Sequence, residues 1–139
     1  MTTRPDLTMA QKVAQAALAF QQQQTGHAPQ AVTVVLGEGT LVITLHGALT
    51  PAEQALATSP SGAAKVQEFH RQLFASTSAS LRQEIRRITG VEVREAAAEI
   101  ETKTGTVVHA FSSGAMVQVF LLAKDISQEA WRQSPATTS

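Results

Sequence analysis

Apolar side chains near the start of the chain recur every three or four positions, which is the spacing of one face of an α-helix. The recurring residues are Met9, Val13, Ala16, Ala17 and Phe20. Thr8 and Gln11 stand at the positions of a capping box, in which each side chain bonds the other residue's backbone amide. Because Thr25-Gly26 is a stop signal, a helix is predicted over residues 9–24.

Two alternating segments follow, and they predict a β-hairpin. Ala31–Leu36 is rich in β-branched residues, and Thr40–Leu49 alternates apolar with more polar positions. Between them, Gly37-Glu38-Gly39 offers two glycines that can adopt positive φ. We therefore expect two antiparallel strands with one wetter face.

A helix-start signal comes directly after the hairpin. Thr50 stands at the N-cap, Pro51 at the first helical position and Glu53 at the third. This is a capping box with a proline in the first turn. It predicts a short helix over residues 51–57, which the turn-forming segment 58–62 interrupts.

A long helix is predicted next, from Ala63 to Thr89 with Gly90 as its C-terminal cap. A stripe along one of its faces is expected to pack on a sheet. The members of this stripe are Val66, Phe69, Leu73, Phe74, Thr77, Leu81, Ile85 and Ile88.

The remaining pattern predicts strands over residues 91–101, 106–111 and 115–122, of which the last is the most apolar and should be central. A short helix is expected within 124–132, with Trp131 docking the tail on the domain.

The order of elements, α-β-β-α-β-β(-β), predicts an α+β fold. We expect a single domain over residues 9–123, with an antiparallel sheet of four or five strands and the helices on one face. Residues 1–8 are predicted to be a disordered lead, and residues 124–139 a short helix and flexible tail. The other face of the sheet would be apolar, so we expect a homodimer that covers it. The residues predicted to lie on this apolar face are Val42, Thr44, Val107 and Val117.

Composition narrows the classes of function. The 139 residues include no cysteine, which excludes thiol catalysis, thiolate metal sites and disulfides, and fits a reducing compartment. Eleven basic residues balance eleven acidic ones, so nucleic-acid binding is not expected. The chain also lacks the run of apolar residues that a membrane span needs. We expect a cytoplasmic protein without direct membrane insertion.

The sequence offers no catalytic constellation. None of its four histidines forms the helical pair of a zinc motif, and there is no nucleophile elbow or phosphate-binding loop. A metal bound between His46 and His109 is less favoured than two ordinary strand histidines. Similarly, Glu95, Glu99 and Glu101 fit a solvated strand edge better than a carboxylate pair. No catalytic residue, metal or cofactor is therefore predicted.

Arginines on the long helix are the strongest polar candidates for a ligand site. They are Arg71, Arg82, Arg86 and Arg87. Arg82 and Arg86 are one helical turn apart and could hold a carboxylate, a phosphate or an acidic surface. The alternative is a mixed solvent-facing surface, since Glu68 and Glu84 lie on the same helix.

The segment Gly47-Ala48-Leu49-Thr50-Pro51-Ala52-Glu53 resembles the MpsC-type family of small bacterial domains. Gly47, Leu49, Thr50, Pro51 and Glu53 carry the motif. The resemblance extends over residues 9–123, through Val32–Leu45, Ile88–Val91, His109–Phe111 and Val117–Leu122. It implies the small soluble component of a sodium-translocating, membrane-potential-generating system, associated with ion or bicarbonate transport. It supplies no catalytic residues.

These observations predict a non-enzymatic accessory or regulatory module that binds a protein partner, with a membrane ion or bicarbonate transport system as the candidate partner. A small-ligand or anion sensor on the arginine face is the alternative. An enzyme that uses His46 or His109 is a third hypothesis.

Overall fold

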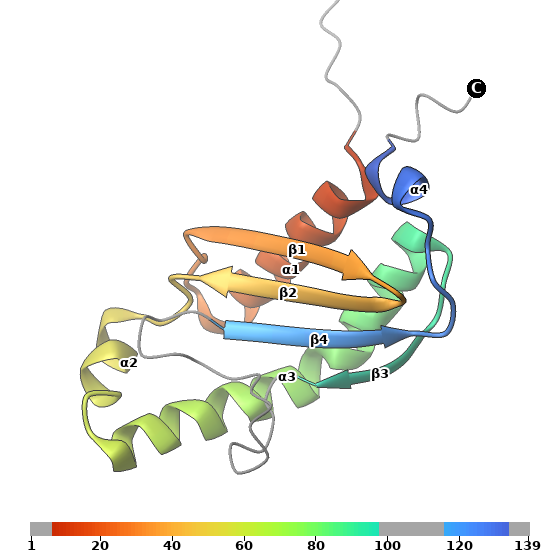
Figure 1. Cartoon of the computed structure of the whole chain (residues 1–139). Coiled ribbons are helices and arrows are strands. Elements are labelled where there is room, and N and C mark those ends of the chain that lie inside the picture. Colours follow the sequence, from red (N-terminus) through yellow and green to blue (C-terminus); the bar gives the residue numbers. More distant parts are fainter. Residues whose placement is uncertain (1–6, 98–115, 134–139) are drawn as a thin grey trace, which may run out of the picture.

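The computed structural model describes residues 7–97 and 116–133, which form four helices and four strands (Figure 1). In chain order they are α1 (Met9–Thr25), β1 (Ala31–Gly37), β2 (Thr40–His46), α2 (Pro51–Leu56), α3 (Pro60–Thr89), β3 (Val93–Ala97), β4 (Met116–Leu122) and α4 (Gln128–Arg132). The predicted α+β class is confirmed. The predicted strand 106–111, with Val107 and His109, lies outside the described residues, as do Glu99, Glu101, residues 1–6 of the lead and residues 134–139 of the tail.

The strands form one antiparallel sheet in the order β1-β2-β4-β3, and β4 has the interior position predicted for it. Helices α1 and α3 lie on the same side of this sheet (Figure 1). Fully buried residues from both layers meet there, among them Val13 of α1, Ile85 of α3 and the cross-strand pair Leu41 and Phe120. The core therefore lies between two helices and one face of the sheet.

The hairpin turn differs from the expected three-residue form. Gly37 is the last residue of β1, and Glu38 and Gly39 alone form the loop, with φ of 52° and 75°. Two consecutive positive φ values match the right-handed twist of paired strands. Asp125 fixes this turn from outside, because its Oδ1 accepts the Gly39 amide at 2.8 Å. A local sequence pattern cannot predict this long-range contact.

Helix α3 begins three residues before the predicted Ala63. Ser59 is its N-cap and accepts a hydrogen bond from the Gly62 amide at 3.0 Å, and Pro60 follows in the first turn. The turn-like composition of residues 58–62 is thus a helix start. A Cβ on Gly62 would lie 1.8 Å from the Leu56 carbonyl oxygen, so glycine lets the end of α2 approach α3. The helix is continuous to Thr89.

Strand β2 ends at His46, earlier than the predicted Leu49, because Gly47 turns the chain with a φ of 62°. The described part of the predicted strand 91–101 is confined to Val93–Ala97. Trp131 is buried, as predicted for a docking residue. No helix within residues 7–97 and 116–133 is long and apolar enough to cross a bilayer.

Candidate functional site

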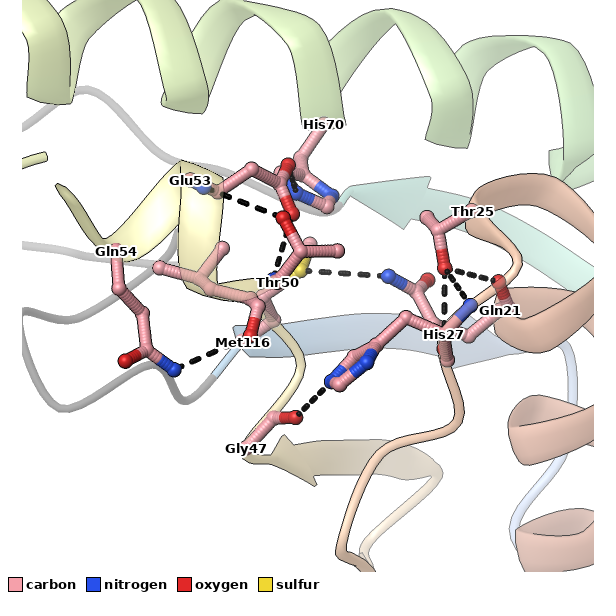
Figure 2. Close-up of polar contacts among 10 residues, drawn as sticks. Gln21, Thr25, His27, Gly47, Thr50, Glu53, Gln54, His70 and Met116 are labelled. Atoms are coloured by element: carbon pink, nitrogen blue, oxygen red, sulfur yellow. Dashed lines mark hydrogen bonds and ion pairs between the residues drawn. The ribbon is translucent and has the colours of Figure 1, made fainter. Parts of the chain in front are cut away.

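The segment from Gly47 to Glu53 lies where α1, α2, α3 and β4 converge (Figure 2). Gly47 adopts a left-handed conformation, and its carbonyl oxygen accepts a hydrogen bond from His27 Nε2 at 3.0 Å. A Cβ at this position would lie 2.7 Å from the side-chain carbons of Gln30. Backbone geometry and close packing both explain a glycine here.

The predicted capping box is present. Thr50 Oγ1 accepts the Glu53 amide at 3.2 Å, and Glu53 Oε1 accepts the Thr50 amide at 2.9 Å. Leu49, just before the cap, is buried, and its carbonyl oxygen accepts a bond from Gln54 Nε2 at 3.2 Å. Pro51 starts the helix. The motif therefore fixes the exit of β2 and the direction of α2.

The second carboxylate oxygen of Glu53 has a partner that the sequence pattern did not predict. His70 Nε2 on α3 lies 2.7 Å from Glu53 Oε2, and the two side chains are 3% and 15% exposed. The signal for His70 was its position four residues after Val66 and four before Phe74, on the buried stripe of α3. Glu53 thus both caps α2 and joins it to α3.

A small cavity of mixed polar and apolar lining lies beside His70. It has a volume of about 10 Å³, room for one water molecule, and Gln21, His70, Met116 and Gln118 are among its lining residues. His70 Nδ1 and Gln118 Oε1 are buried there without hydrogen-bond partners in the described part of the chain. Gln21 Nε2 contacts Met116 Sδ at 3.8 Å.

A wider groove opens on the outer side of the same motif. It has a volume of about 320 Å³ and is lined by Gln24, Thr25, Thr50, Glu53, Leu56, Lys65, Val66 and Phe69. We call it the motif groove. Leu56 and Phe69 are 47% and 48% exposed, so Phe69 is not the core residue that its helical spacing predicted. The groove is a largely apolar hollow with polar residues at its wall.

Three of the polar residues that line the motif groove, Thr25, Thr50 and Glu53, are engaged in structural bonds. Glu53 uses one oxygen for the Thr50 amide and the other for His70. In the described ranges, no cluster of three or more His, Asp or Glu side chains could hold a metal ion. His46 lies apart on β2 and bonds Thr33 Oγ1 at 3.0 Å, whereas the proposed partner His109 is outside the described residues. The arrangement is suited to binding an apolar group.

Two of the four candidate arginines pair with glutamates one turn earlier on α3. Arg71 pairs with Glu68, and Arg87 with Glu84. The hydrogen bond from Arg87 lowers the pKa of the Glu84 carboxyl and raises that of the guanidinium. Both pairs are solvent-facing, as the mixed-surface alternative for this helix expected.

Arg82 and Arg86 are brought together at a hollow of about 330 Å³ between α3 and β3. Arg82 donates to the carbonyl oxygens of Val93 and Arg94, at 2.9 and 3.3 Å. Arg86 lies 3.5 Å from a carboxylate oxygen of Glu92. Arg82 is thus a tie between helix and strand, and Arg71 and Arg87 lie outside this hollow.

Comparison with known families shows which family the chain resembles. A family model described as Na+-translocating membrane potential-generating system (MpsC) matches residues 6–113. The match contains α1, the hairpin, the motif and α3, whereas β4 and α4 follow its end. It confirms the resemblance that the motif predicted. No curated protein and no solved structure matches the chain.

Proposed function

The chain belongs to the MpsC family, and we propose that it is a non-enzymatic accessory module that docks on a protein of a membrane-potential-generating system. The motif groove is the docking site. The observation that carries this proposal is the position of Leu56 and Phe69. They are two of the three large hydrophobic side chains that are exposed in the described residues, and both line the groove.

Single exposed apolar side chains are common, but an apolar hollow rimmed by polar residues is typical of an interaction site. Val66 lies in the groove and is only 3% exposed, so the hollow has a closed apolar floor. Grooves of this kind accept the apolar face of an amphipathic helix, one of the recurring modes of peptide recognition. The occupant that we propose is such a helix, supplied by the partner protein.

Charge adds a requirement on that helix. Lys65 lines the groove, and no ion pair is found for it within the described ranges. Glu53, the only acidic residue of the lining, is bonded to Thr50 and His70. We therefore expect the docked helix to carry an acidic residue that faces Lys65. Pairs at an interface rim contribute more to association rate and specificity than to affinity.

Association with the membrane would follow from this partner, consistent with the lack of a membrane-spanning helix in the described ranges. The proposed location is the cytoplasmic side, which the cysteine-free composition supports.

The experiment is a crosslinked pull-down from gently solubilised host membranes, read by mass spectrometry. Tagged wild-type protein should recover an integral membrane subunit of an ion or bicarbonate transport system. Phe69→Ser and Leu56→Ser should lose it. Gln83→Ser removes an exposed side chain farther along α3 and should retain it. Equal recovery with all variants, or recovery of the bait alone, would contradict docking through the groove.

Photocrosslinking locates the contact. Benzoylphenylalanine replaces Phe69 in one sample and Gln83 in the control. We expect a crosslink from position 69 to an amphipathic segment of the membrane subunit that contains an acidic residue. A crosslink only from position 83 would place the partner on the opposite end of α3.

A further inference from the structure

The face of the sheet opposite α1 and α3 has an unusual composition. Cross-strand pairing places five apolar side chains on it: Val35, Val42, Val117, Val119 and Leu121. We call them the open-face residues. Val35 is 57% exposed, and the other four are half-buried by their neighbours. No described helix covers this side (Figure 1).

Charged side chains are missing from this face along β1, β2 and β4. The positions between the open-face residues hold alanine, glycine, threonine and His46. Glu95, on the edge strand β3 opposite Leu121, is the nearest acidic position in the register. The solvent-exposed face of an antiparallel sheet ordinarily carries polar side chains. An apolar, uncharged face therefore indicates a buried interface.

We infer that the open-face residues pack against the same face of a second copy of the chain. A two-fold axis brings identical patches together. A patch with charges of one sign would therefore meet the same charges on the second copy, and their repulsion would weaken the dimer. An uncharged patch has no such penalty, and the whole chain has no net charge to oppose association. A face that selected a different protein would instead be expected to carry charges that reject wrong partners.

The alternative route to a dimer, pairing of two β1 edges, is obstructed. Gln128 of α4 donates its side-chain amide to the Leu36 carbonyl oxygen at 2.9 Å. Helix α4 packs beside β1, with Trp131 buried in the contact. Covering an edge with a helix is a common protection against strand pairing. Because α4 covers the β1 edge, we expect the second copy to pack on the open-face residues.

Val42 is the position that tests the inference, because it lies on the interior strand β2 between Val35 and Val119. Light scattering after gel filtration should give wild-type protein twice the chain mass of 14.7 kDa. Val42→Lys and Val42→Glu should each be monomeric and folded by circular dichroism, with dimer affinity reduced by about 100-fold or more. Ala19→Lys, on the exposed side of α1, should remain dimeric.

Mixing gives the sharper result. Equal amounts of folded Val42→Lys and Val42→Glu should form a heterodimer, because the opposite charges meet across the axis. Wild-type protein that is monomeric at all concentrations would overturn the inference and leave residues 98–115 of the same chain as the alternative cover. A Val42→Lys dimer as tight as wild type, or a mixture of folded variants without heterodimer, would also overturn it. Val42→Thr, which keeps a β-branched side chain, should give an intermediate dimer affinity and guards against misfolding.

Discussion

His70 Nε2 lies 2.7 Å from Glu53 Oε2, and this contact joins the long helix α3 to the short helix α2. The other oxygen of the same carboxylate accepts the Thr50 amide. One side chain therefore performs two tasks, a local cap and a tertiary link. This explains a glutamate in the family-like motif without assigning it a catalytic role.

The link between Glu53 and His70 should be measurable by a double-mutant cycle. We expect Glu53→Ala to reduce the free energy of unfolding by about 1–3 kcal/mol, because it leaves His70 buried without its partner. The pair Glu53→Gln and His70→Gln should show a coupling energy of about 0.5–3 kcal/mol in urea unfolding. Glu84→Ala, which removes a solvent-facing pair, should cost at most about 1 kcal/mol. Additive effects of the two glutamine substitutions would mean that the contact contributes nothing to stability.

Gly47→Ala should be destabilising for two separable reasons. Its φ of 62° costs an alanine about 1–2 kcal/mol, and the new Cβ meets the Gln30 side chain. Gly26→Ala is the matched control, because it has a φ of 73° but no atom within 4 Å of the added Cβ. Gly47→Ala should therefore lower the melting temperature more than Gly26→Ala, and Gln30→Ala should remove the difference. Equal effects at the two glycines would assign the whole cost to the backbone.

Arg82 and Arg86 should differ in their effects although both line the same hollow. Arg82→Ala removes the bonds to the Val93 and Arg94 carbonyl oxygens and should destabilise the protein by about 1–2 kcal/mol. Arg86→Ala removes only an exposed ion pair and should change stability by less than about 1 kcal/mol. Urea unfolding measures both. A loss for Arg82→Ala no larger than that for Arg86→Ala would contradict a stabilising tie between Arg82 and β3.

The same variants test the anion-sensor hypothesis. The measurement is calorimetric titration of wild-type protein with bicarbonate and with inorganic phosphate. If the hypothesis holds, one of these anions gives heat of binding, and folded Arg86→Ala protein gives none. No heat with either anion would reject these two ligands at this hollow.

The pair of Glu84 and Arg87 gives a prediction about pH. The hydrogen bond from Arg87 lowers the Glu84 pKa from its ordinary value of 4.5. A carboxyl whose folded pKa is lowered contributes stability above the unfolded pKa and loses it as the pH falls through the folded pKa. NMR titration should therefore show a higher Glu84 pKa in Arg87→Ala than in wild type. An unchanged Glu84 pKa would mean that the pair does not persist in solution.

Local signals in the sequence determined that the helices and the motif cap form, although α3 begins at Pro60 and not at the predicted Ala63. The Thr8/Gln11 and Thr50/Glu53 boxes join residues three positions apart, so composition and spacing are enough to specify them. Alternation likewise predicted β1 and β2, and the apolar content of β4 predicted its interior position. The caps and the strand alternation depend on short-range geometry, and the position of β4 on its apolar content; a sequence pattern expresses both directly.

Only the tertiary structure decided what these elements do together. Helical spacing predicted that Phe69 packs on the sheet. However, the first part of α3 extends beyond the sheet toward α2 (Figure 1), and Phe69 is exposed with Leu56 in the motif groove. Helical spacing fixes the face on which a side chain stands, but not whether a neighbouring element covers that face. The same limit applies to Glu53 and His70, which are separated by 17 residues, and to Arg82, whose acceptors are backbone carbonyls of β3. Contacts between distant segments depend on how the helices dock, and the pattern within each segment does not contain that information.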